Sequence, residues 1–257
     1  MKLFGGTPKI IESKEKNNWK VELDDLKKNC SAKTKILILN NGSNPTGVLY
    51  SGKEIRAILE FAVEKNLFVI SDEVYSGLVY DNNQFISCAS FPKFRNNLAV
   101  IQSCSKNFAM TGWRVGFVFG EKKLIQILVS LTSQSTSGAA TISQWAAVAA
   151  LQNSKIIMSQ IQAEMQKRRN AFCDAFAENF GVTLTKPPSG LYCFIPLIAF
   201  GTKVSDSVQF CQNILSEANV AMVSGVSFGH EGFVRCSLGE RPEELEIALK
   251  HLASYLK

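Results

Sequence analysis

Four short apolar runs, separated by helical patterns and loops, constrain the fold of this chain more than any other feature. They are KILILN (35–40), LFVISD (67–72), LAVIQS (98–103) and VGFVFG (115–120). Continuous apolar runs of this length are typical of strands buried on both faces of a sheet. Because strands alternate with helices here, we predict a layered α/β fold with a mostly parallel sheet, in which the fourth strand lies beside the third.

Helical patterns dominate the middle of the chain. Ser51, followed three positions later by Glu54, predicts a capping box at the start of a helix. Further helices are predicted over residues 121–131, 140–152 and, with amphipathic spacing, 154–180. Gly181 is expected to end the last and longest of them.

The last quarter of the chain has a different pattern. Its predicted strands lie in GVTLT (181–185), GLYCFIP (190–196), VAMVS (220–224) and FVRCSL (233–238), with helices near 204–218 and after Pro242. This βαβ-like set predicts a second, smaller α+β domain. We therefore expect a large domain over residues 1–153, a connecting helix over 154–180 and a C-terminal small domain over 181–257.

The composition argues against several classes of protein. The 257 residues are 46% hydrophobic and 19% charged, and the net charge of +6 is spread along the chain, unlike the basic patch of a nucleic-acid binder. Seven cysteines without a C-x-x-C pair and only two histidines argue against a disulfide framework or a metal site. The sequence shows neither a signal-peptide core nor an apolar run of membrane length, so we expect a cytoplasmic protein without membrane or nucleic-acid partners.

Polar residues follow the ends of the predicted strands. In α/β sheets, ligands collect at the carboxyl ends of the strands. Four segments are placed there by the predicted elements: Asn40–Gly47, Asp72–Tyr75, Ser103–Lys106 and, in the second domain, Arg235. Although they are distant in sequence, we expect them to share one rim.

Three of these residues have ordinary explanations when each is taken alone. Asp72 either caps a helix or holds a cationic partner, such as a protonated ring nitrogen. Asn44, which precedes Pro45, either belongs to a plain turn or points its amide outward. Tyr75 either packs in the core or, three residues after Asp72 on a helical turn, faces the same side as that carboxylate.

The cationic residues leave similar alternatives. Lys106 lies in SCSKNFAMTGWRVGF (103–117), which contains no acidic residue. Arg114 and Ser103 suit an anion such as phosphate, because a guanidinium offers a fork of donors, but each is also an ordinary hydrogen-bonding residue. Arg235, inside an apolar strand, needs either a buried anionic partner or the carboxylate of a ligand.

Together these residues match one chemistry. The chain resembles the class I/II aminotransferases of fold type I, which depend on pyridoxal 5'-phosphate, and most of all the aspartate aminotransferases of bacterial type. The motifs that carry the resemblance are SNPTG (43–47), SDEVYSGLVY (71–80), SCSKNFAMTGWRVGF (103–117), QSTSGAATISQWAA (134–147), PSGLYCF (188–194) and FVRCSL (233–238). They follow the order of the family over nearly the whole chain.

The resemblance implies a role for each residue toward the cofactor. Lys106 would form the Schiff base and then move the proton between the substrate α-carbon and the cofactor. Asp72 would pair with the protonated pyridine nitrogen, and Tyr75 and Asn44 would donate hydrogen bonds to the phenolate oxygen. The residues implied for the phosphate are Ser103 and Arg114, with Ser105 as a weaker candidate.

The resemblance implies further roles toward the substrates and toward a second copy of the chain. Arg235 would bind the α-carboxylate of the amino acid in a two-pronged pair, and Asn44 would also bind the substrate. The implied reaction transfers an amino group between an L-amino acid and a 2-oxo acid, and family members are usually homodimers. Residues 115–167 contain no arginine that could hold a second carboxylate, so the substrate stays open among aspartate, aromatic, alanine-type and other amino acids.

The sequence also departs from the family pattern. In the family, a phosphate-binding turn and an aromatic residue that stacks on the pyridine ring precede anything like LFGGTPKIIE (3–12), and no such turn occurs before Asn44. We therefore expect an incomplete large domain, and we favour a truncated chain over one whose missing half comes from another chain. The expected consequences are weak cofactor affinity, impaired activity and an exposed apolar sheet edge. The alternatives are a β-elimination lyase acting on C–S or other bonds on the same fold, and a non-catalytic remnant.

Overall fold

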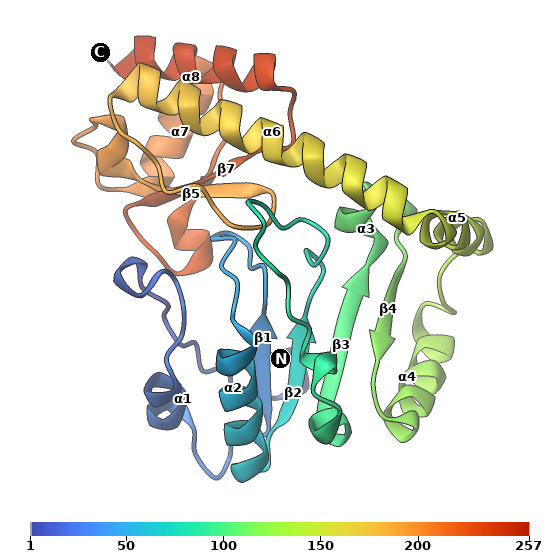
Figure 1. Cartoon of the computed structure of the whole chain (residues 1–257). Coiled ribbons are helices and arrows are strands. Elements are labelled where there is room, and N and C mark those ends of the chain that lie inside the picture. Colours follow the sequence, from blue (N-terminus) through green and yellow to red (C-terminus); the bar gives the residue numbers. More distant parts are fainter. Residues whose placement is uncertain (1, 257) are drawn as a thin grey trace.

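The computed structural model describes residues 2–256 and contains two separate sheets (Figure 1). The larger sheet has the order β1 (Ile36–Asn40), β2 (Phe68–Asp72), β3 (Leu98–Ser103), β4 (Gly116–Phe119). The first three strands are parallel, and β4 runs antiparallel beside β3. The predicted α/β fold and the place of the fourth strand are confirmed.

Helices connect and flank the larger sheet. They are α1 (Leu23–Asn29), α2 (Gly52–Glu64), α3 (Cys104–Asn107), α4 (Lys122–Ser135) and α5 (Thr141–Gln152). The predicted capping box at the start of α2 is present: the Ser51 hydroxyl accepts from the Glu54 N–H, and the Glu54 carboxylate accepts from the Ser51 N–H. The long helix α6 (Ser154–Phe180) ends where expected, at Gly181 in the left-handed conformation.

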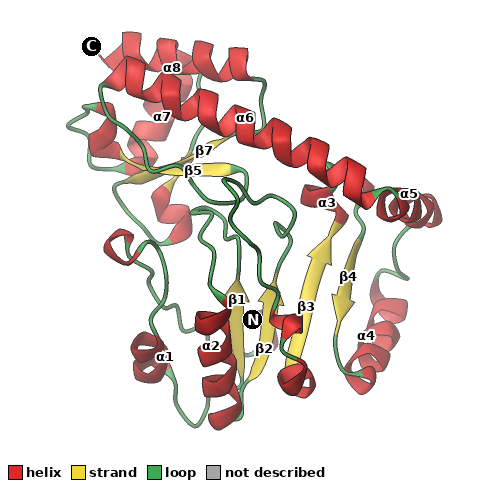
Figure 2. Cartoon of the chain, viewed as in Figure 1, coloured by secondary structure: helices red, strands yellow, loops and turns green. Residues whose placement is uncertain are grey.

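The smaller sheet lies toward the carboxyl ends of the parallel strands of the larger sheet, and Figure 2 shows α6 running along both sheets. Its elements are β5 (Tyr192–Pro196), α7 (Ser207–Ala218), β6 (Val223–Ser224), β7 (Phe233–Ser237) and α8 (Pro242–Leu256), with the strand order β5-β7-β6. Since β7 is antiparallel to both neighbours, β5 and β6 run parallel with β7 between them. The strands β5 and β6 with the helix α7 therefore form the predicted βαβ-like unit, and β7 lies between the two strands.

One predicted strand is wrong. Residues 182–185 form no strand in the structure, and Val182 is exposed. The segment leads directly into Pro187 and Pro188, which have no N–H to donate to a sheet. It serves instead as the loop that returns the chain from α6 toward β5.

The burial of β1 also differs from the prediction. Leu37 and Leu39 pack into a core with α2, but Ile36 and Ile38 on the opposite face remain 48% and 50% exposed. The strand is therefore apolar on both faces but covered on only one. This exposure concerns a face of the strand, and β1 is also an outer strand of the sheet among the described residues.

A second core joins the small sheet to α6, α7 and α8. Cys193, Val234 and Cys236 of the sheet face this core, and Phe172 and Phe176 of α6 pack against them. Residues of the large-sheet region enter it as well, namely Tyr75, Leu78 and Tyr80. None of the helices between residues 2 and 256 combines the length and the apolar character needed to cross a membrane.

Candidate functional site

Asp72 is the last residue of β2, and few groups nearby compensate the negative charge of its carboxylate. The backbone N–H of Val74 donates to its Oδ1 at 3.3 Å, and no cation forms an ion pair with it among residues 2–256. Burial raises the pKa of this carboxyl above its ordinary value. Residues 74–77 form a turn, so Asp72 does not cap the helix that was one of its possible explanations.

The Asn44 loop is tied to the same strand end. The carbonyl of Asp72 accepts from the Asn41 N–H and from the Asn40 side-chain amide, both at 3.1 Å. The Asn40 amide oxygen in turn accepts from the Asn44 N–H at 3.2 Å. The peptide bond between Asn44 and Pro45 is cis, and the Asn44 side chain is exposed. The loop after β1 and the end of β2 therefore form one hydrogen-bonded unit.

Tyr75 lies in the turn after Asp72 and is nearly fully buried. Its ring packs edge-on against Tyr192 of β5, with 6.3 Å between the ring centroids. Burial, the Tyr192 hydroxyl and the negative charge of Asp72 together raise the pKa of the Tyr75 hydroxyl, and Arg235 opposes the rise. Of the two explanations offered by the sequence, packing in the core therefore applies to Tyr75.

Lys106 lies in the short helix α3, and its side-chain amine makes no hydrogen bond or ion pair with the rest of the described chain, although its backbone carbonyl accepts from the Ala109 N–H at 3.4 Å. Ser103 begins this helix, because its hydroxyl accepts from the Ser105 N–H at 3.0 Å. The side chain of Asn107, the residue after Lys106, accepts from the Gly77 N–H at 3.0 Å and donates to the Ser76 hydroxyl at 3.1 Å. These bonds join α3 to the turn after Asp72.

Arg114 lies just before β4, in the left-handed backbone region with a φ of 53°. The β4 register places Gly116 opposite Ser103, and the Cys104 N–H donates to the Val115 carbonyl at 3.2 Å. The backbone of Arg114 is therefore next to the start of α3. Its side chain is exposed and donates only to the nearby Thr111 carbonyl, at 3.0 Å, within the part of the chain that is described.

Arg235 reaches this rim from the other sheet. Its Nη1 donates to the Asn44 amide oxygen at 3.0 Å, across 191 positions of sequence. Its Nε is buried and has no hydrogen-bond partner among the described residues. Of the two explanations offered by the sequence, a buried anionic partner is not found for it within residues 2–256. An uncompensated guanidinium edge therefore lies beside the Asn44 loop.

The loop before β5 packs tightly on the Asn44 loop. The Ser189 hydroxyl donates to the Gly47 carbonyl at 2.6 Å, and Ser189 is fully buried. Gly47 has a φ of +69°, and a Cβ atom at this position would lie 2.2 Å from the Ser189 carbonyl oxygen. Only glycine permits this approach, which sets the distance between the two loops.

Behind these loops, Arg169 of α6 is a fully buried arginine. It pairs with both carboxylate oxygens of Asp81 and donates to the Pro187 carbonyl at 3.0 Å. The Tyr80 ring lies 4.9 Å from its Cζ, and the Tyr80 hydroxyl donates to the Gly190 carbonyl at 2.5 Å. α6 therefore supports the segments that lead to Tyr75 and to Tyr192.

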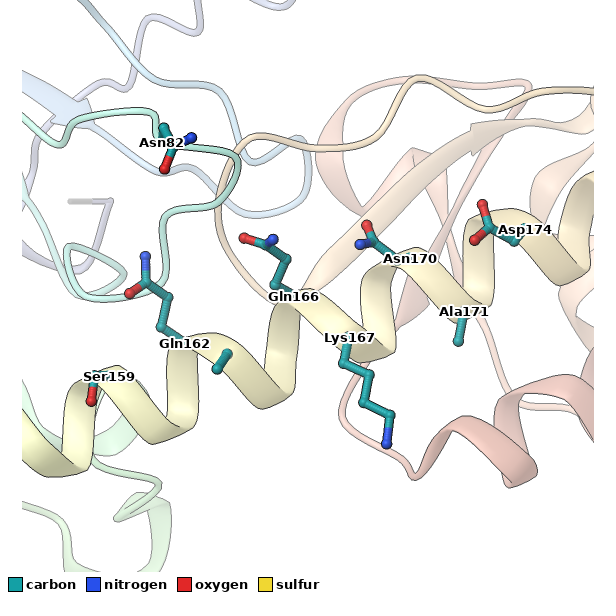
Figure 3. Close-up of a pocket in the computed structure, with 9 residues that line it drawn as sticks. Asn82, Ser159, Gln162, Gln166, Lys167, Asn170, Ala171 and Asp174 are labelled. Carbon is teal, nitrogen blue, oxygen red and sulfur yellow. The ribbon is translucent and has the colours of Figure 1, made fainter.

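A shallow polar groove on the surface of α6 is separate from this rim (Figure 3). The side chains of Gln162 and Gln166 point from α6 toward the loop that carries Asn82. Gln166 accepts from the Asp81 N–H at 3.1 Å, and Gln162 donates to the Val79 carbonyl. The groove contains none of the predicted site residues, and its amides are engaged in holding the loop against α6.

The structure brings most of the predicted site residues together at the carboxyl ends of the strands. Asn44 contacts Arg235, Tyr75 lies in the turn that follows Asp72, and Ser103 and Ser105 begin the helix of Lys106. Arg114 is adjacent through its backbone only. Sequence reasoning named Asn40 only as the start of the segment Asn40–Gly47, and it missed Asn107 and Tyr192. Asn107 directly follows Lys106, and this adjacency is the signal that could have found it.

Comparisons with known proteins identify the family of this chain. Residues 1–252 match the family described as aminotransferase class I and II. A probable aspartate/prephenate aminotransferase of Aquifex aeolicus is 32% identical over all of this chain, which covers 66% of that protein. An aspartate aminotransferase of Pyrococcus abyssi is 35% identical over 99% of the chain and 66% of its own length. The chain thus spans about two thirds of the length of these curated relatives.

Solved structures show the same likeness. The aromatic aminotransferase of Pyrococcus horikoshii superposes with a TM-score of 0.88 at 34% identity, over 96% of this chain and 66% of that one. The aspartate aminotransferase of Thermotoga maritima gives a TM-score of 0.88 at 31% identity, over 99% and 65%. These values identify the architecture as fold type I. The chain belongs to the class I and II aminotransferase family.

Proposed function

We propose that this chain takes part in the transfer of an amino group between an L-amino acid and a 2-oxo acid, with pyridoxal 5'-phosphate as cofactor and aspartate-aminotransferase-like substrates. One observation carries the proposal. Asp72, Lys106 and Arg235 lie on hydrogen-bonded neighbouring segments around the rim, and each lacks an oppositely charged partner within the described chain. Uncompensated charges on a rigid frame are typical of sites that await a ligand.

The residues present fit this cofactor. A carboxylate whose pKa is raised by burial gains most from a cationic neighbour, and a protonated pyridine nitrogen is such a neighbour. An unpaired primary amine on the adjacent segment suits an aldehyde, and Ser103 and Ser105, with the exposed Arg114 whose backbone lies next to them, suit a phosphate. Asp72, Lys106, Arg114 and these serines would hold the group, with Tyr75 and Asn44 at its ring oxygen.

The bound cofactor supplies an electron sink for negative charge that develops at the substrate α-carbon. Lys106 would hold the cofactor through Nζ and, when released, move the proton at the α-carbon. Arg235 would bind the α-carboxylate along its free edge while Asn44 occupies Nη1, and so orient the α-carbon toward Lys106. Asp72 would stay ionised and maintain the protonated ring.

We further propose a cytoplasmic homodimer with the domains predicted above, in which residues 154–180 connect a large and a small domain. All seven cysteines are free thiols, which suits a reducing compartment. No residue of α4 is buried, and the apolar side chains Ile127, Val129 and Leu131 are exposed on it, as is Trp145 on α5. Apolar surface of this kind supports a protein–protein contact. Light scattering with size-exclusion chromatography would show a defined dimer mass; a monomer or a polydisperse species would contradict it.

The visible absorbance spectrum tests the cofactor proposal. The purified chain is mixed with pyridoxal phosphate, and we expect an imine band that Lys106→Ala abolishes and that the exposed-lysine variant Lys123→Ala retains. A band that survives in Lys106→Ala would contradict the assignment. Product analysis then tests the reaction: a 2-oxo acid with a transferred amino group supports it, whereas pyruvate with free ammonia indicates β-elimination.

A further inference from the structure

The guanidinium of Arg235 packs against two aromatic rings from different segments. Its Cζ lies 4.2 Å from the ring centroid of Tyr192 and 5.0 Å from that of Phe228. Tyr192 begins β5, and Phe228 ends the 3-10 turn Gly225–Phe228 that precedes β7. The donors of a guanidinium point outward along its edges, and its flat faces suit stacking on aromatic rings. The two rings therefore restrain the group without using its donors.

Only some of the N–H donors of this guanidinium have hydrogen-bond acceptors within the described chain. Nη1 donates to Asn44 at 3.0 Å, whereas the buried Nε has no acceptor within residues 2–256. Nε and Nη2 form the edge opposite this bond, a two-donor fork that matches the spacing of carboxylate oxygens. A buried N–H without an acceptor is costly, and an incoming carboxylate would remove that cost.

The rings are themselves held in place. Phe194 lies directly opposite Arg235 in the β5–β7 register, and its ring packs edge-on against Phe228, with 6.0 Å between centroids. Trp19, from the first part of the chain, packs on Phe194 at 5.3 Å. Aromatic pairs of this geometry contribute to stability and reduce ring motion. Phe194 and Trp19 thus support the Phe228 ring, and the cluster of these rings limits the movement of the Arg235 guanidinium.

We propose that Phe228 and Tyr192 are positioning residues that fix the plane of the Arg235 guanidinium before a substrate carboxylate arrives. The proposal rests on the proposed function, in which Arg235 binds that carboxylate. A free arginine side chain loses rotamer freedom when it binds a ligand, whereas a stacked one has lost that freedom already. The rings therefore strengthen carboxylate binding without contacting the carboxylate.

The test compares three phenylalanine variants of the full chain loaded with pyridoxal phosphate. Phe228→Leu removes the ring beside Arg235, and Phe228→Tyr keeps it. Phe233→Leu is the matched control, because Phe233 stacks on Phe194 in the same cluster but makes no cation–π contact with Arg235. Pyruvate is the probe, and the ¹⁵Nε–¹H NMR signal of Arg235 reports its binding.

We expect Phe228→Leu to weaken pyruvate binding about fivefold, as the loss of one cation–π contact predicts, and Phe228→Tyr and Phe233→Leu to stay close to wild type. In turnover, KM for both substrates should rise by a similar factor while kcat changes little, because the chemistry at Lys106 is untouched. Equal weakening by Phe233→Leu and Phe228→Leu would overturn the proposal, as would wild-type affinity in Phe228→Leu.

Two further measurements complete the design. If Phe228→Leu does not fold, Tyr192→Leu against Tyr192→Phe makes the same comparison on the other ring. If the wild-type Arg235 signal does not respond to pyruvate, and Arg235→Lys behaves like wild type, the role of Arg235 in the proposed function fails, and the positioning role fails with it. A wild-type response with no effect from either ring variant would overturn the positioning role alone.

Discussion

Arg169 and Asp81 form a two-pronged ion pair, with nitrogen–oxygen distances of 2.6 and 2.7 Å, in which the arginine is buried and the carboxylate side chain is 50% exposed. The same guanidinium donates to the Pro187 carbonyl. It therefore joins the long helix to the loops on both sides of the proposed site. The pair is a support for the site rather than a part of it.

Loss of the Asp81 carboxylate should destabilise the chain. Asp81→Ala leaves a buried guanidinium without its counter-charge, and we expect a loss of about 2 kcal/mol in the free energy of unfolding, less than for a fully buried pair because Asp81 is half exposed. Urea unfolding measures it. Asp174→Ala is the control, since its pair with Lys186 is exposed and should contribute much less. Equal effects in both variants would contradict the support role.

The same pair predicts a pH dependence of stability. The hydrogen bonds from Arg169 hold the pKa of Asp81 below its ordinary value of 3.8. A carboxyl whose pKa is depressed by folding stabilises the folded state above its unfolded pKa, and this contribution is lost as the pH falls through the lower, folded value. The stability difference between wild type and Asp81→Asn should therefore be full near neutral pH and shrink below about pH 4. A difference that stays constant down to pH 3 would contradict the assignment.

Asp72 should behave in the opposite way. Because burial raises its pKa, ionisation of Asp72 opposes folding of the cofactor-free chain as the pH rises through the folded value. We expect Asp72→Asn to raise the thermal midpoint of the cofactor-free chain at neutral pH and to weaken pyridoxal phosphate binding. Thermal unfolding with and without cofactor measures both effects. A variant less stable than wild type without cofactor would show that Asp72 has a structural partner instead.

Gly47 offers a test of the contact between the two loops. Gly47→Ala combines a φ of +69° with a Cβ only 2.2 Å from the Ser189 carbonyl oxygen, so we expect a loss of at least about 2 kcal/mol. Gly181→Ala is matched in φ, at +70°, but meets no atom within 4 Å, and should cost only about 1 kcal/mol. Chemical denaturation of both variants separates backbone strain from the steric clash.

Much of the architecture could be predicted because it depends on local patterns. The strand ending at Asp72, the capping box of Ser51 and the helix stop at Gly181 each follow from a few neighbouring residues. The apolar residues of GVTLT gave the same local signal, but a strand also needs a hydrogen-bonding partner, which local sequence does not reveal. The strand prediction for residues 181–185 is therefore wrong because this segment has no neighbouring strand to pair with among the described residues.

The candidate site was less accessible to sequence reasoning because its contacts are non-local. Motif order placed Asn44 and Arg235 at one rim, yet no pattern indicated that they bond directly or that Phe228 lies against the guanidinium. The exposure of the Arg114 side chain, its bond to the Thr111 carbonyl and its left-handed backbone were equally hidden. The family resemblance indicates such residues, but their partners are contacts between distant segments of the fold.

The position of Trp19 in the aromatic cluster beside Arg235 gives the chain an intrinsic fluorescence probe. Trp19 packs on Phe194, Phe233 and His230, whereas Trp113 and Trp145 are 43% and 70% exposed. A chain in which the two exposed indoles are replaced by phenylalanine would emit from a single site two rings away from Arg235. Its emission would then record movements of the small sheet without an added dye.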